Sequence, residues 1–220
     1  MNPSADIRRK FRTPDEPEPL RGADASRERL LQATHELLIE TGGAEPSVSQ
    51  ICARAGMQAG MVSYCFGGKR QLLNALLYRS TDDVLEELRN LAASDLSPTE
   101  KLRKHVRGMI ANFVRYPYAQ HISEILAATE PETRPVTERF AAPTLDFYRD
   151  LVAEGVTAGE FRADVDSNLL FFTTVGMCEF LFAAKSWLPL AGEQLDDQLL
   201  ERFAEHCAGV LLNGIAGTGT

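Results

Sequence analysis

The fold of this chain is decided by residues 48–69, which read VSQICARAGMQAGMVSYCFGGK. Two short helical stretches, at about 48–54 and 58–64, flank Gly56, where a residue without Cβ can adopt left-handed backbone angles. The apolar positions of both stretches are spaced to bury a common joint, and small or polar residues remain on the surface. This pattern predicts a helix-turn-helix, whose second helix enters the major groove of DNA. An ordinary helical hairpin in a bundle is the structural alternative.

The surface of the second short helix supplies the candidate base contacts. Small residues at its leading end let the backbone approach the bases, and a glutamine there can bond an adenine through two hydrogen bonds. We expect the following residues to face the groove: Gln58, Ala59, Gly60, Met61, Ser63 and Tyr64.

The same region is locally basic, although the whole chain carries a formal net charge of −8. From Pro46 to Thr81 there is no acidic residue, and the basic residues present include Arg54 and Lys69. A basic end on an acidic body suits one anionic partner, so Arg54 and Lys69 are candidate DNA contacts. Chance clustering of charge is the alternative explanation.

Helical patterning continues over nearly all of the remaining chain. The stretch from Ser47 to Gln50 has the pattern of a capping box, which starts a helix. No stretch alternates with period two for long enough to predict a sheet, so we expect an all-α fold of about nine helices. We expect a disordered arm at 1–24, a helix-turn-helix domain at 25–70 and a larger helical domain at 71–220. The arm either reaches along the DNA minor groove or stays solvated.

Composition and motifs exclude several other classes of protein. The chain has 220 residues, 44% of them hydrophobic, which excludes a collagen and a wholly disordered chain. Its polar amino terminus predicts no signal peptide, so we expect a cytoplasmic protein with reduced cysteines. Gly67, Gly68 and Lys69 lack the other residues of a phosphate loop, and neither a zinc-protease pair nor a hydrolase serine motif occurs. The sequence therefore predicts no catalytic residue, no metal site, no cofactor and no enzyme.

Residues 26–77 resemble the amino-terminal domain of the TetR family of one-component bacterial regulators. The stretch 61–73, MVSYCFGGKRQLL, is especially similar to the subgroup that contains the choline-responsive regulator. Ser63 departs from the family pattern, because most members have a tyrosine there that binds a phosphate. The residues that carry the resemblance are Thr41, Gly42, Ser47, Ile51, Ala55, Gly56, Gly60, Phe66, Lys69, Leu72 and Leu73.

The resemblance implies a function as well as a fold. It implies phosphate contacts from Ser47, Tyr64 and Lys69, in a repressor that binds a palindromic operator in double-stranded DNA. It also implies a homodimer through the last two helices and release by a small-molecule effector bound in the larger domain. Choline is not implied, because the similarity to that subgroup stops at the DNA-binding module. A helical ligand-binding or scaffold protein without DNA binding is the alternative function.

The candidate ligand-binding residues are aromatic side chains and one carboxylate in the larger domain. Aromatic residues at helical spacing serve either as core or as the wall of a pocket. The apolar stretch between Asp166 and Lys185 predicts a helix from Asn168 to about Trp187. Glu179 lies in this stretch, where an unpaired carboxylate is costly. It either binds an effector or pairs with an arginine of its own or a partner subunit, and the charged flanks of the stretch disfavour a membrane span. The candidates are Phe113, Tyr116, Phe147, Phe172 and Glu179.

Overall fold

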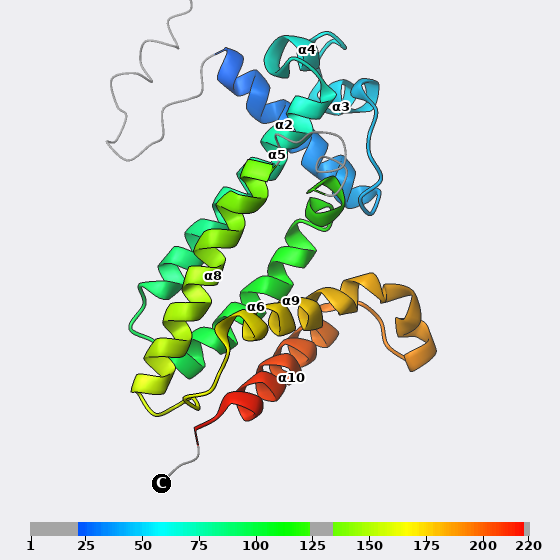
Figure 1. Ribbon diagram of the computed structural model, residues 1–220. Helices are drawn as coiled ribbons and strands as arrows, with labels where there is room; N and C mark the ends of the chain where they lie inside the picture. Colours follow the sequence, from blue (N-terminus) through cyan, green and yellow to red (C-terminus); the bar gives the residue numbers. More distant parts are fainter. Residues whose placement is uncertain (1–21, 124–133, 218–220) are drawn as a thin grey trace, which may run out of the picture.

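The structure, a computed structural model, describes residues 22–123 and 134–217, so residues 1–21 of the predicted arm lie outside it. Within the described residues the backbone is helical apart from turns and one isolated bridge, which confirms the predicted all-α fold. Residues 119–123 are also helical. The bounded helices are α2 (Ala23–Glu40), α3 (Val48–Ala55), α4 (Met61–Phe66), α5 (Lys69–Ala92), α6 (Pro98–Arg115), α8 (Arg134–Thr157), α9 (Ser167–Ala183), the 3-10 helix η2 (Lys185–Ala191) and α10 (Asp197–Ile215) (Figure 1).

Local sequence signals start and stop the helices of the N-terminal module. Ser47 Oγ accepts the Gln50 amide at 3.2 Å, and Gln50 Oε1 accepts the Ser47 amide at 2.8 Å, which confirms the capping box. Gly56 ends α3 with a φ of 65°, in the left-handed region that favours glycine. Helix α4 begins at Met61, later than predicted, because residues 58–60 form a turn closed by a 3.0 Å hydrogen bond from the Met61 amide.

Helices α2, α3 and α4 and the start of α5 pack into a small N-terminal bundle with a core of its own. This bundle forms one end of the molecule, with α4 at its outer edge and α10 at the opposite end (Figure 1). The outer side of α4 is therefore open to a partner. The core residues are Leu30, Ala33, Ile51, Cys52, Ala55, Val62 and Leu72.

Helix α5 connects the N-terminal bundle to the larger domain. It is 24 residues long and runs from one part into the other, so the boundary predicted after residue 70 falls inside a continuous helix. A second apolar cluster packs α2 and α5 against the segment that follows α6. The two parts are thus joined by a shared helix and a shared cluster. The cluster comprises Leu38, Leu73, Leu76, Leu77, Tyr118 and Ile122.

The larger domain packs α5, α6, α8, α9 and α10 around one core. Helix α9 ends at Ala183, earlier than the predicted end at about residue 187, because the following residues form η2 with Pro189 inside it. Among the described residues no single helix is long and apolar enough to cross a membrane. Helices α9 and η2 pass that test only as a pair, and a bend of 73° separates them.

Candidate DNA-binding face and internal cavity

The residues predicted to face a DNA groove lie together at the exposed end of the N-terminal bundle. Tyr64 on α4 is 78% exposed, and its neighbour Ser63 is also exposed. Met61 is half-buried at the start of α4. Gln58 and Ala59 lie in the turn before α4 rather than on the helix, and both are exposed. The structure therefore brings these residues to one surface, whose leading edge is a turn and not a helix.

Two further predicted contacts, Ser47 and Gly60, lie on the same exposed end. The Ser47 hydroxyl is engaged in the capping box of α3 but remains exposed. Gly60 has φ −69° and ψ −14°, angles open to any L-residue, and a Cβ added there would meet no atom within 4 Å. The described fold therefore gives no packing reason for glycine at this position, whereas close approach of a partner's backbone does.

Two arginines of α2 hold the ends of α3 and α4. The Arg27 guanidinium donates to the carbonyl of Cys65 and lies 4.2 Å from the centroid of the Phe66 ring. Arg29 donates to the carbonyl of Ala55 at 2.6 Å, so carbonyls that lack a partner at a helix end are satisfied. The sequence reasoning missed both residues, and no local signal marks them, because their partners lie 38 and 26 positions away.

The two cations predicted to meet DNA are paired with carboxylates in this chain. Lys69 Nζ lies 2.7 Å from Glu45 Oε1. The Arg54 guanidinium lies 2.7 Å from Glu40 Oε2, with a Glu36 oxygen at 3.4 Å. The hydrogen bond from Arg54 lowers the pKa of Glu40 below its usual value. These pairs are solvent-accessible, so exchanging a carboxylate for a phosphate costs little.

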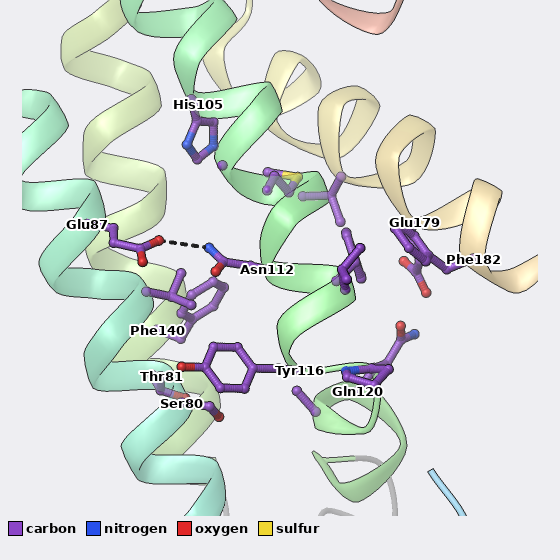
Figure 2. Close-up of a pocket in the computed structure, with 18 of the residues that line it drawn as sticks. Ser80, Thr81, Glu87, His105, Asn112, Tyr116, Gln120, Phe140, Glu179 and Phe182 are labelled. Carbon is purple, nitrogen blue, oxygen red and sulfur yellow. Dashed lines mark hydrogen bonds between the residues drawn. The ribbon is translucent and has the colours of Figure 1, made fainter. Parts of the chain in front are cut away.

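A cavity of about 1150 Å³ lies in the larger domain, with walls from α5, α6, α8 and α9 (Figure 2). Three of the predicted ligand-binding residues line it, namely Phe113, Tyr116 and Glu179. Phe147 does not; it is buried in the core of the domain. Phe172 is 64% exposed outside the cavity. One step along a helix rotates a side chain by about 100°, which turns Phe172 away from the lining face of α9.

Several polar side chains of the cavity wall are engaged with partners in the protein. The hydroxyls of Ser80 and Thr81 donate to the carbonyl of Leu77 at 2.9 and 2.8 Å. The hydroxyl of Tyr116 donates to Asp83 at 2.6 Å. Burial and this hydrogen bond raise the pKa of Tyr116 to about 12, so the phenol stays protonated.

His105 and Glu179 of the cavity wall make no such bond with the described residues. The His105 ring lies against the rings of Phe147 and Tyr148, with centroids 4.9 and 5.3 Å away. Burial lowers the pKa of His105 to about 4, which keeps the imidazole neutral at pH 7. The Glu179 carboxylate extends from α9 toward Gln120 (Figure 2) and makes no hydrogen bond or ion pair in the part of the chain that the structure describes.

Helix α2 of the N-terminal bundle touches the wall of the cavity. His35 Nδ1 on α2 lies 2.6 Å from the hydroxyl of Tyr118, whose side chain is fully buried. The Tyr116 ring lines the cavity and stands edge-on to the His35 ring, with centroids 5.9 Å apart. Gly42, just after α2, also lines the cavity. Direct contacts therefore lead from the cavity to the helix that carries the helix-turn-helix.

The last two helices expose an apolar surface on the side away from the cavity. Gly176 of α9 lies in this surface, and a Cβ added there would meet no atom within 4 Å. Exposed apolar patches of this kind mark protein–protein contacts. The exposed apolar side chains are Leu169, Phe172 and Phe180 on α9 and Val210 on α10.

Both parts of the chain match known protein families. Residues 30–76 match the family described as bacterial regulatory proteins, tetR family. Residues 95–220, more than half of the chain, match the family described as tetracyclin repressor-like, C-terminal domain.

Curated relatives fall into two kinds. The HTH-type transcriptional regulator BetI 1 of Chromohalobacter salexigens is 34% identical over 90 residues, a match that covers 40% of this chain and 43% of that protein. The HTH-type transcriptional repressor KstR2 of Rhodococcus jostii is 22% identical over 210 residues, covering 93% of this chain and 98% of the relative. The chain thus spans less than half the length of the first relative and nearly all of the second.

Solved structures share the fold of the whole chain. The ketosteroid transcriptional regulator KstR2 of Mycobacterium tuberculosis superposes with a TM-score of 0.68 at 19% identity, covering 86% of this chain and 94% of that one. The transcriptional regulator FadR of Bacillus subtilis, solved in complex with stearoyl-CoA, superposes with a TM-score of 0.63 at 19% identity, covering 86% and 98%.

Proposed function

Because this chain belongs to the TetR family of bacterial regulatory proteins, we propose that it is a transcriptional repressor that binds a DNA operator as a homodimer. A small-molecule effector in the larger domain releases it. The chain acts as a regulator rather than as an enzyme, in the cytoplasm where the operator is. The observation that carries the proposal is a helix-turn-helix with an open outer face, packed on a helix, α2, that contacts the wall of a large cavity.

The exposed end of the N-terminal bundle is the proposed DNA-binding face. Tyr64 and Ser63 bind phosphate, and the turn that carries Gln58 meets the base edges. The space beside Gly60 supports close approach of the DNA backbone. Lys69 and Arg54 reach phosphates after exchanging their carboxylate partners. Phosphate contacts of this kind supply affinity that falls with salt.

The exposed apolar surface of α9 and α10 is the proposed dimer interface. Phe172 and Phe180 stand out of α9 on the side away from the cavity, so a second copy can cover them without closing it. Gly176 lets the facing backbones approach closely. A two-fold axis through these helices presents two copies of α4 to DNA, and their half-sites lie about one helical turn apart.

The contacts around Tyr118 are the proposed route from effector to DNA. A ligand that fills the cavity pushes on Tyr116, and the adjoining segment is bonded to His35 of α2. Movement of α2 changes the separation of the two DNA-binding faces in a dimer. The effector then favours the separation that no longer fits the operator.

Selection of bound sites from a random pool of DNA, with the purified protein, tests the proposed function. We expect an enriched palindrome whose half-sites lie about one turn apart. Tyr64→Ala should weaken binding to the selected site roughly tenfold or more. The change removes a hydrogen bond from an uncharged hydroxyl to a phosphate but removes no packing. The matched control is Ile39→Ala, another exposed side chain, on α2. No enrichment at low salt by folded, dimeric protein would contradict DNA binding and leave a ligand-binding protein.

A further inference from the structure

The cavity is large enough to enclose a ligand and apolar enough to hold one tightly. Its volume of about 1150 Å³ is slightly above the usual range for small-molecule sites, about 300–1,000 Å³. Aromatic rings form part of the wall, and Phe113 of α6 stacks on Phe182 of α9 with centroids 5.2 Å apart. Any ligand that fills this space must also satisfy the polar groups that it strips of water.

The hydroxyl groups of the wall that bond within the protein have already used their hydrogens there. Ser80 and Thr81 donate to one carbonyl, and Thr144 donates to the carbonyl of Phe140 at 2.7 Å. Tyr116 donates to a carboxylate at 2.6 Å. What these oxygens still offer to a ligand is their acceptor capacity. A ligand beside this part of the wall must therefore supply hydrogen-bond donors.

The amide of Asn112 and the carboxylate of Glu87 are also engaged with partners in the protein. Asn112 Nδ2 donates to Glu87 Oε2 at 3.2 Å, as the dashed line of Figure 2 shows. Glu87 also receives the Arg115 guanidinium at 2.7 Å, so that cation is held by its own carboxylate. The remaining amino cations of the wall, Lys104 and Lys185, are exposed to solvent.

Glu179 is a half-buried charged group of the wall that makes no hydrogen bond or ion pair with the described residues. It lies beside Phe182 on α9, and its carboxylate extends into the space in front of Gln120 (Figure 2). Solvent satisfies it while the cavity holds water. A ligand that displaced this water without supplying a positive charge or a donor would leave a carboxylate unpaired among rings.

We propose that the effector is a lipophilic organic cation, an amine or a quaternary ammonium, whose charge is bound by Glu179 and by the aromatic wall that the stacked rings of Phe113 and Phe182 form. Carboxylates and aromatic faces both attract a weakly hydrated cation, and their attraction is stronger where water is excluded. This proposal rests on the proposed function only where it calls the ligand the effector. Binding in the cavity is a separate property and is tested without DNA.

Two pairs of ions of similar shape and opposite charge test the proposal. The first pair is tetraphenylphosphonium and tetraphenylborate; the second, slimmer pair is octyltrimethylammonium and octyl sulfate. Binding of each is measured by titration calorimetry on the purified full-length protein. We expect at least one cation to bind at least tenfold more tightly than the anion of its pair.

Glu179→Gln is the decisive variant, because it keeps the size of the side chain and removes its charge. We expect it to weaken binding of the cation roughly tenfold or more and to leave the weak binding of the anion unchanged. The matched control is Glu86→Gln on α5, an exposed residue outside the cavity with the same change in net charge. The control should bind both ions as the unaltered protein does.

Three results would overturn the proposal: neither cation binds, the anions bind as tightly as the cations, or Glu179→Gln binds the cations as tightly as the unaltered protein. If Glu179 instead pairs with a basic residue of a second subunit, Glu179→Gln lowers the melting temperature or loosens the dimer without affecting cation binding. The selected DNA site gives an independent readout. If a cation binds but does not release the DNA, the proposed regulation is contradicted, while the proposed ligand class stands.

Discussion

The two ends of the molecule treat their polar groups in opposite ways. At the DNA-binding end, Lys69 and Arg54 lie in solvent-accessible pairs with carboxylates. Around the cavity, Ser80 and Tyr116 are bonded inside the protein, and His105 is kept neutral by burial. Exposed pairs are worth little and exchange easily, whereas enclosed groups are costly to leave unpaired. The exposed end is thus suited to a large, exchangeable polyanion and the enclosed end to one selected small ligand.

The largest effect is expected at His105, whose ring is packed against the rings of Phe147 and Tyr148. Its pKa is about 4 in the folded chain and about 6.5 in the unfolded chain, so between these values only the unfolded chain takes up the proton. Stability is therefore lost as the pH falls from 6.5 toward 4, by up to about 3 kcal/mol from this group. Denaturant unfolding at a series of pH values, at constant protein concentration, measures this loss.

His105→Gln removes the titration, so the difference in the free energy of unfolding between variant and unaltered protein should change with pH across that window. His121→Gln, which replaces an exposed histidine at the edge of the cavity, is the matched control for the loss of an imidazole. Parallel pH profiles for His105→Gln and the unaltered protein would mean that burial does not keep this imidazole neutral.

A middle-sized effect is expected at the junction of the two ends. Tyr118→Phe removes the hydroxyl that lies 2.6 Å from His35 Nδ1 and leaves that nitrogen without its partner. We expect a loss of about 1–2 kcal/mol in the free energy of unfolding. Tyr64→Phe removes an exposed hydroxyl and should leave stability unchanged. Equal stabilities for the two variants would show that the junction is no more enclosed than the surface.

The smallest effect is expected at an exposed pair. Glu45→Gln frees Lys69 for a phosphate, so it should tighten binding to the selected DNA site a few-fold at low salt and change stability by less than about 1 kcal/mol. The gain should vanish at high salt, where exposed charges are screened. Glu201→Gln on α10 makes the same change in net charge far from the DNA-binding face. A similar gain with Glu201→Gln would assign the effect to net charge rather than to Lys69.

Local signals account for what the sequence predicted well. The capping box of Ser47 and Gln50 and the left-handed turn at Gly56 each act within a few residues, so the helix-turn-helix was predictable from one stretch. The start of α4 was predicted too early, because no local signal distinguishes the turn at 58–60 from a first helical turn. The end of α9 was predicted too late, because its apolar residues continue into η2.

Contacts between distant residues account for what was missed. Nothing in the sequence marks Arg27 and Arg29. They hydrogen-bond to the ends of α4 and α3 only when α2 packs against these two helices. Phe113 and Glu179 were expected near a ligand and do line the cavity, but whether they bind one stays a prediction. Phe172 was expected beside them and lies on the outer surface, since periodicity defines faces of a helix but not what each face meets.

Local residue patterns were enough to predict the helices, the helix-turn-helix and the family, because caps, glycines and apolar spacing act over a few residues. Packing between distant segments pairs Lys69 and Arg54 with carboxylates, brings α2 to the cavity wall through His35, and leaves Glu179 without a hydrogen bond or ion pair among the described residues. The physical reason is that the state of a charged or polar group depends on what replaces its water, and in a folded chain that replacement comes from residues distant in sequence.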